Sequence, residues 1–155
     1  MKRIFIVLIS LFLLTVYTPV YGAEQIKTAE IEYLADGSYF ETIITAEPAR
    51  GAILFSSNSV TKTKTSYYKN SKGTVLWYVR VTGRFTYGNG TAKCTSSSVS
   101  AASNSSAWKI TSKSAGKNGA KAIGRAAAKR YYSGSVAETR NKAVTLTCSP
   151  SGNFL

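Results

Sequence analysis

A strict alternation of residues on either side of a short turn is the feature that most constrains the fold. The stretches "SVTKTKTSYYK" (59–69) and "GTVLWYVRVTGRFTYGNG" (73–90) both alternate along their length. Between them, Asn70 and Gly73 occupy the first and fourth positions of "NSKG", as in a type I turn followed by a glycine in the left-handed region. The pattern therefore predicts a β-hairpin with a bulge at the glycine.

The predicted register of this hairpin assigns a face to each side chain. Taking Gly73 and Thr74 together opposite Asn70 places Tyr67 across from Trp77. The core face then carries Val75, Trp77, Val79, Val81 and Phe85. The opposite face points outward and holds five candidate anion-binding residues: Lys62, Lys64, Tyr78, Arg80 and Arg84.

On that outward face, Lys64 is expected directly across from Arg80. Like charges in this position destabilise a strand pair by a few tenths of a kcal/mol to about 1 kcal/mol. Three explanations for their tolerance remain open: an anionic ligand, contact with Glu30, Glu32 and Glu41 of the preceding segment, or solvation with salt screening.

The rest of the chain is also typical of strands. No long stretch between residues 23 and 115 keeps a helical period, and turn signals arrive at short intervals. Further strands are expected at "YFETIIT" (39–45), "AWKITSK" (107–113) and "AVTLTCS" (143–149), whereas the serine-rich residues 94–107 form either a polar edge strand or a loop. We predict an all-β chain with a single antiparallel β-sandwich-like domain.

One segment, residues 116–135, is compatible with two structures. Lys117, Lys121, Arg125 and Lys129 recur every four residues, which fits one side of a helix or one face of a strand. Three glycines and the "SGS" turn that follows favour a strand.

The chain opens with the pattern of a secretory signal peptide. Lys2 and Arg3 precede an apolar run over residues 4–14, and small residues follow at Gly22 and Ala23. We place cleavage after Gly22, giving a signal peptide over residues 1–22. The alternative is a retained anchor, but the apolar run is shorter than the roughly 20 residues that a spanning helix needs. The mature protein is expected to be secreted, extracellular or cell-wall associated, without integral membrane association.

Charge divides the mature chain into two parts. Residues 23–47 form an acidic N-terminal segment, and "EPARG" (47–51) resembles a linker where the charge changes sign. Residues 48–155 are strongly basic, with Glu138 as the only acid, and the whole chain carries a net charge of +13. This favours anionic polymers or surfaces as partners; the alternative is a solvated basic surface that keeps the protein soluble.

The residues that common catalytic and metal sites require are missing. The sequence has no histidine, and Glu138 stands alone after residue 48, so neither a Ser-His-Asp triad nor a carboxylate pair is available there. We therefore expect no enzyme activity, no cofactor and no metal. The two cysteines, Cys94 and Cys148, are expected to form a disulfide because the chain is exported, which would stabilise the fold by roughly 4 kcal/mol. A redox pair or metal ligands have less support.

Together, the signal peptide, "YYKNSKGTVLW", "KCTSSS", "AWKITSKSAG" and "VTLTCSPSG" resemble a group of small exported proteins of unassigned function from Gram-positive, mostly clostridial, bacteria. The resemblance covers nearly the whole mature chain. It implies an extracellular compartment and a β-rich fold with a Cys94–Cys148 bridge, and it implies no activity.

Two functions from different classes follow. The first is a secreted, non-enzymatic binding or structural module whose basic β-face associates with anionic cell-envelope polymers, such as teichoic acids, or with acidic glycans. The second is a bacteriocin-like or toxin-like cationic antagonist, in which residues 116–132 act on membranes, especially as a helix. A specific nucleic-acid partner is not expected because export removes the protein from nucleic acid.

Overall fold

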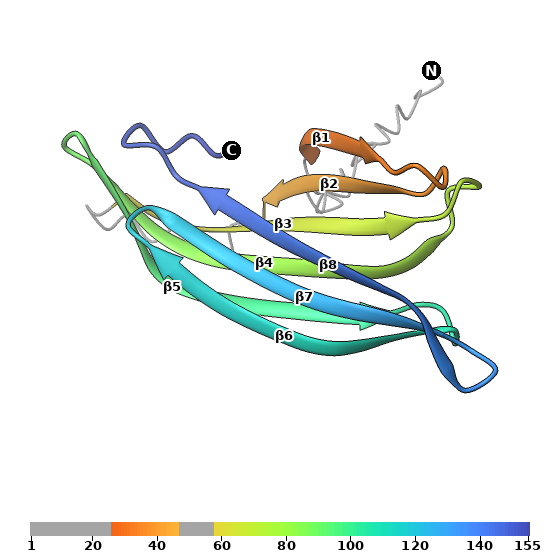
Figure 1. Cartoon of the computed structure of the whole chain (residues 1–155). Coiled ribbons are helices and arrows are strands. Elements are labelled where there is room, and N and C mark those ends of the chain that lie inside the picture. The colour runs from red at the N-terminus through yellow and green to blue at the C-terminus, as the bar shows by residue number, and fades with distance from the viewer. Residues whose placement is uncertain (1–25, 47–57) are drawn as a thin grey trace, which may run out of the picture.

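The computed structural model describes residues 26–46 and 58–155, which form two antiparallel β-sheets (Figure 1). The first sheet has the order β1-β2-β3-β4-β5, with β1 (Ile26–Tyr33), β2 (Tyr39–Ala46), β3 (Asn58–Lys69), β4 (Val75–Gly88) and β5 (Thr91–Ser103). The second has the order β6-β7-β8, with β6 (Trp108–Asn118), β7 (Lys121–Tyr132) and β8 (Ser135–Thr147). The all-β prediction is confirmed. The predicted signal peptide and "EPARG" linker lie outside the described residues.

The turn at "NSKG" forms as its sequence predicts. The Gly73 amide donates to the Asn70 carbonyl oxygen at 2.9 Å, and Gly73 has a φ of 82°. The Asn70 side-chain oxygen also accepts hydrogen bonds from the amides of Lys72 and Thr74. The side chain of asparagine thus holds the loop in the one conformation that joins β3 to β4.

The predicted register beyond this turn is wrong by one residue. Lys69 pairs with Val75 as expected, but a bulge follows at Leu76, so Tyr68 rather than Tyr67 pairs with Trp77. The carbonyl oxygen of Leu76 accepts hydrogen bonds from the Asn104 amide and the Ser103 hydroxyl. These partners lie far away in sequence, at the end of β5, and the bulge turns every following side chain of β3 to the opposite face.

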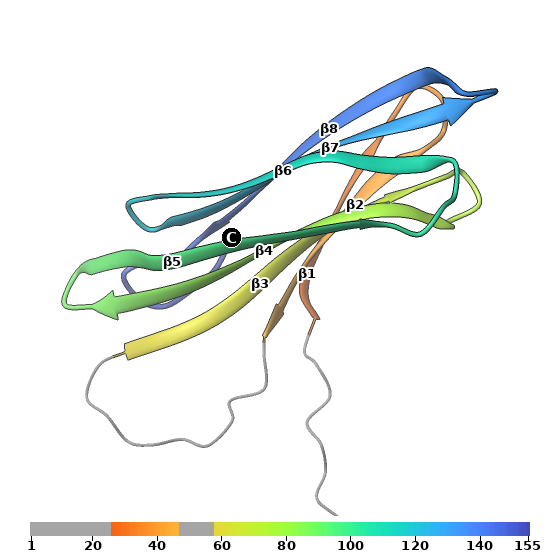
Figure 2. The ribbon, with the colours of Figure 1, turned by 90° about the horizontal axis from the view of Figure 1, so that it is seen from below.

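The two sheets lie against each other as two layers (Figure 2). The layers touch where β4 and β7 face one another, because glycine and alanine allow close approach. A Cβ atom on Gly83 would lie 2.7 Å from the Cβ of Ala122, and one on Gly124 would lie 3.0 Å from the Cβ of Val81. Small residues therefore set the spacing of the layers at their centre.

Apolar side chains fill the space between the layers. Trp77, Val79, Val81 and Phe85 are fully buried along β4, as predicted for the core face. At one end, Tyr68 packs against the rings of Trp77 and Trp108 at centroid distances of 5.7 and 5.3 Å. The core is thus continuous across both sheets.

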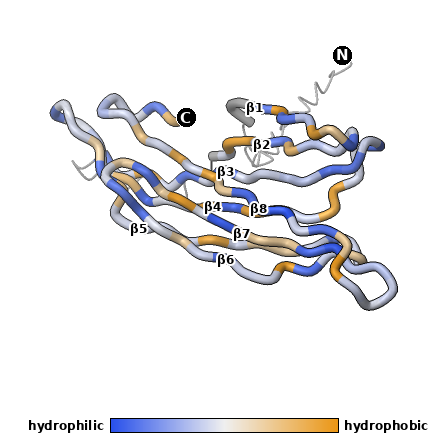
Figure 3. The backbone as a smooth tube through the Cα atoms, in the orientation of Figure 1, coloured by the Kyte–Doolittle hydropathy of each residue, from blue (hydrophilic) through white to orange (hydrophobic). Residues whose placement is uncertain are grey.

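The ambiguous segment is a strand, as favoured by its glycines. Residues 121–132 form β7, the central strand of the second sheet, and Gly119 provides the turn from β6 with a φ of 55°. Residues 94–103 of the serine-rich region belong to edge strand β5, which begins at Thr91. Figure 3 shows the alternation of hydrophobic and hydrophilic residues along the strands of both sheets.

The expected disulfide does not form in this structure. Cys94 on β5 and Cys148 after β8 are both buried free thiols, and burial raises the pKa of each. Their backbone amides donate to the adjacent carbonyl oxygens of Gly119 and Ala120, at 2.8 and 3.0 Å. The Cys94 bond joins the first sheet to the β6–β7 turn of the second, whereas the Cys148 bond continues the pairing of β7 with β8.

Candidate anion-binding faces

Tyr78, Arg80 and Arg84 lie on the outer face of the five-stranded sheet, as predicted. Both arginines are exposed on β4. The guanidinium of Arg80 lies 5.6 Å from the centroid of the Tyr78 ring, and its Nε donates to the Thr65 hydroxyl at 3.1 Å. Arg84 contacts the Ser59 hydroxyl through its Nε at 3.3 Å. These three side chains share one face, although both arginines are held by neighbours on β3.

The prediction that Lys62 and Lys64 belong to that face is wrong. Because of the bulge at Leu76, Lys64 pairs with Val81 and Lys62 with Gly83, so both project to the inner side. Lys64 is only 9% exposed. Thr65, not Lys64, lies across from Arg80, and the expected like-charge pair does not occur.

Carboxylates of the acidic segment neutralise lysines of both sheets. Glu30 lies 3.8 Å from the Nζ of Lys64, Glu41 pairs with Lys69 at 2.6 Å, and Glu32 on β1 reaches Lys142 on β8 at 2.5 Å. The Nζ of Lys142 also lies 4.3 Å from the centroid of the Phe40 ring, so its charge is satisfied on two sides. The contacts of Glu30, Glu32 and Glu41 with basic residues, which were considered from the sequence, are therefore present.

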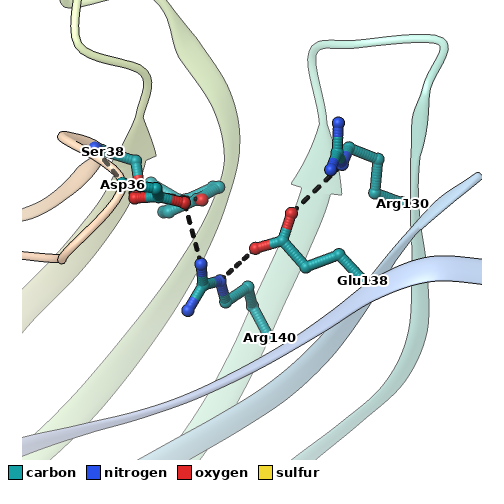
Figure 4. A network of polar contacts seen from close by, with 6 residues as sticks. Asp36, Ser38, Arg130, Glu138 and Arg140 are labelled. Carbon is teal, nitrogen blue, oxygen red and sulfur yellow. Dashed lines mark hydrogen bonds and ion pairs between the residues drawn. The ribbon is translucent and has the colours of Figure 1, made fainter.

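A network of ion pairs continues this arrangement toward the β7–β8 turn (Figure 4). Arg140 contacts Asp36 at 2.9 Å through Nη2 and Glu138 through Nε, while Glu138 contacts the Nε of Arg130 at 3.1 Å. Hydrogen bonds from the hydroxyl and amide of Ser38 lower the pKa of Asp36. We call the set of inward charges the charged flank; it comprises Glu30, Glu32, Asp36, Lys64, Arg130, Glu138, Arg140 and Lys142.

The sequence contained a signal for part of the charged flank. Val144 and Leu146 of "AVTLTCS" are buried, and residues 138, 140 and 142 have the same parity along the strand. Extending the alternation backwards would have placed Glu138, Arg140 and Lys142 on the inner side. Their acidic partners on β1 and in the turn before β2 could not be assigned in this way.

Every acidic side chain that the structure describes takes part in one of these ion pairs, which leaves other cations without an acidic side-chain partner among the described residues. Several gather on the outer face of the second sheet. We call this surface the β7 face; its cations are Lys109, Lys121, Arg125 and Lys129. None of the outward residues that β6, β7 and β8 contribute to it is acidic.

The middle of the β7 face is hollowed. A depression of about 550 Å³ opens there, where the outward side chains of Ala127 and Ala143 are small. Its rim offers hydrogen-bond donors from all three strands: Ser112, Ser114, Arg125 and Asn141. No carboxylate lines it, so the site is suited to oxyanions rather than cations.

Other kinds of site have less support. Within residues 26–46 and 58–155, no group of three His, Cys, Asp or Glu side chains is placed to hold a metal ion. The same ranges contain no helix with the length and apolar character needed to cross a membrane. Comparison of the chain with protein-family models, curated proteins and solved structures finds no match.

Proposed function

We propose that the protein is a secreted, non-enzymatic, β-sandwich-like module that binds anionic polymers of the cell envelope, such as teichoic acids, or acidic glycans. The β7 face is the binding surface. Arg80, Arg84 and Tyr78, on the outer face of the other sheet, contribute a weaker second surface. Lys62 and Lys64 take no part because they project to the inner side.

The observation that supports this proposal is the segregation of charge. The described acidic side chains pair with cations of the charged flank or with Lys69, whereas the charged side chains of the β7 face are all cations. A surface with one sign of charge attracts polyanions and concentrates them at short range. Because the attraction acts between exposed groups, it is screened over about 8 Å at physiological salt and depends strongly on ionic strength.

The β7 face is preferred over the face of Arg80 and Arg84 for a second reason. The Nε of Arg80 and the Nε of Arg84 already donate to hydroxyls of β3. No hydrogen bond or ion pair engages the Arg125 side chain with any residue in the described ranges. Its guanidinium is therefore available for a bidentate contact with an oxyanion.

The membrane-acting alternative receives no comparable support. Its active element, residues 116–132, lies in β6, β7 and the turn between them, with the small residues of β7 packed against β4. An amphipathic helix from this segment would first have to leave the core.

A pull-down of the purified protein on purified cell walls, at low and at moderate salt, tests the proposal. Two double variants remove the same charge from an interior strand of each sheet: Lys121→Gln with Arg125→Gln on β7, and Arg80→Gln with Arg84→Gln on β4. We expect binding that weakens with salt and falls about tenfold in the β7 variant, corresponding to the loss of two exposed ionic contacts. Binding of the β4 variant to cell walls should fall by a smaller factor. Binding that ignores salt, or no binding by the unmodified protein, contradicts the proposal.

Export is part of the same proposal. The intact mass of the protein recovered from the culture medium should correspond to a chain beginning at Ala23. Retention of residues 1–22 in the recovered protein would contradict it.

A further inference from the structure

The cations of the β7 face form a row along one strand. Lys121, Arg125 and Lys129 have the same parity on β7, where neutral outward residues separate them. A strand rises about 3.3 Å per residue, so neighbouring cations are about 13 Å apart and the row is about 26 Å long. Lys109 on β6 pairs with Lys129 and adds a charge at one end.

Across the strands, the charge pattern is different. The residues beside Arg125 are Ser114 on β6 and Ala143 on β8, both uncharged. Lys121 likewise lies between Asn118 and Thr147. A ligand crossing the sheet at Arg125 or Lys121 would therefore meet one cation, and one crossing at Lys129 would meet two with Lys109, whereas a ligand following β7 would meet three.

The depression lies at the centre of the row. Arg125 stands at its rim, with the hydroxyls of Ser112 and Ser114 on one side and the amide of Asn141 on the other. An anionic group seated there can accept hydrogen bonds from donors on three strands. Lys121 and Lys129 then lie at roughly equal distances along the strand from this central group.

We infer that a linear polyanion binds along β7, with one anionic group in the depression at Arg125 and flanking groups reaching Lys121 and Lys129. The inference rests on the proposed function and specifies the direction and minimum length of the ligand. The ligand must carry anionic groups over about 26 Å to use the whole row.

Oligoglutamate peptides with blocked ends provide a length series because a chain of n residues spans at most about 3.3–3.6 Å × n. A four-residue peptide covers about half of the row, and an eight-residue peptide covers all of it. By isothermal titration calorimetry at low salt, we expect an affinity increase between the two peptides that is larger than the doubling expected from charge number alone. Lys129→Gln should reduce the affinity for the eight-residue peptide about two- to fivefold, the loss of one exposed ionic contact, and leave that for the four-residue peptide nearly unchanged.

A composition-preserving variant separates spacing from net charge. Exchanging Lys121 and Ile123, as Lys121→Ile with Ile123→Lys, keeps both side chains on the outward face and moves one cation about 7 Å toward Arg125. We expect affinity for the eight-residue peptide to fall about two- to fivefold. Circular dichroism on the same samples confirms that the variant is folded.

The possible failures are distinguishable. In one outcome the protein binds cell walls, but peptide affinity in the length series and in the exchange variant depends on the number of charges alone. The inferred row is then overturned, and the proposed function stands. If the unmodified protein binds neither cell walls nor either peptide, the proposed function fails as well. Polyphosphate of matched length, used as a third probe, shows whether the row prefers phosphate to carboxylate groups.

Discussion

Strand β7 has two faces with opposite chemistry, and each is suited to a different task. Ala122, Gly124, Ala126 and Ala128 are buried on its inner face against the first sheet. Lys121, Arg125 and Lys129 alternate with them on the outer face. A strand rich in small residues can thus bring two layers close together while it carries a row of spaced charges toward the solvent. Substitutions on the inner side should change stability, and those on the β7 face should change binding.

The largest effect is expected where the inner side is most completely packed. Trp77 is fully buried and contacts the rings of Phe40, Tyr68 and Trp108. Trp77→Ala should lower the free energy of unfolding by about 3–5 kcal/mol, measured by urea denaturation. The neighbouring Tyr78→Ala, on the outer face of the same strand, should cost about 1 kcal/mol. Similar losses in the two variants would contradict the assignment of faces.

A smaller loss is expected from overfilling the contact between the layers. The Cβ of a residue at position 124 would lie 3.0 Å from Val81 and 3.1 Å from Val99, so Gly124→Val should destabilise the protein by about 1–3 kcal/mol. Gly116→Val is the matched control because the only neighbour near its Cβ is the Arg125 guanidinium, at 3.9 Å. Thermal unfolding should show little change for the control. If Gly116→Val were as unstable as Gly124→Val, the close contact at Gly124 would not explain the loss of stability.

Substitutions of Arg140 and Arg125 should have different effects, because Arg140 forms ion pairs within the fold and Arg125 lies on the β7 face. Arg140 joins Asp36 to Glu138, and its side chain is 31% exposed. Arg140→Met should therefore lower the free energy of unfolding by about 1 kcal/mol, after allowance for solvent screening. Arg125→Met should leave the free energy of unfolding within about 0.5 kcal/mol of the original value and weaken polymer binding. If Arg125→Met destabilised the protein as much as Arg140→Met, the β7 face would have a structural role.

The smallest effect concerns pH. Hydrogen bonds from Ser38 hold the pKa of Asp36 below its ordinary value of 3.8, so the unfolded state binds a proton more readily than the folded state. The resulting stabilisation is present above pH 3.8 and is lost as the pH falls through the folded-state pKa. Asp36→Asn should therefore unfold more easily than the original protein at pH 6, with the difference shrinking toward pH 2. A difference that does not depend on pH would show that the carboxylate charge is not involved.

Local sequence was sufficient for much of the fold. The Asn70 and Gly73 turn forms as its composition predicts because its hydrogen bonds involve residues within four positions. The alternation in β4 correctly separates Trp77, Val79, Val81 and Phe85 from Tyr78, Arg80 and Arg84 because side chains on a strand have a period of two. The glycines of residues 116–135 correctly favoured a strand.

The candidate site required more than alternation. Arg125, Lys121 and Lys129 were recognisable as a regular row, but nothing local showed that small residues of the same strand would be covered by another sheet. The depression depends on Ser112, Ala127 and Asn141 lying side by side, which follows from the pairing of three strands. For Lys64, the sequence predicted the wrong face.

By itself, the sequence determined the all-β class, the strands on either side of the main turn, that turn and the excess of positive charge, because propensity, alternation and composition act over short distances. Only the tertiary structure decided which charges are neutralised and which remain at the surface. One bulge at Leu76, held by the end of β5, turned Lys64 inward to Glu30. Cys94 and Cys148, which were expected to form a disulfide, remain buried free thiols, and their amides donate to two adjacent residues of the β6–β7 turn. Such outcomes depend on contacts between residues distant in the chain, where a shift of one position reverses the face of a whole strand.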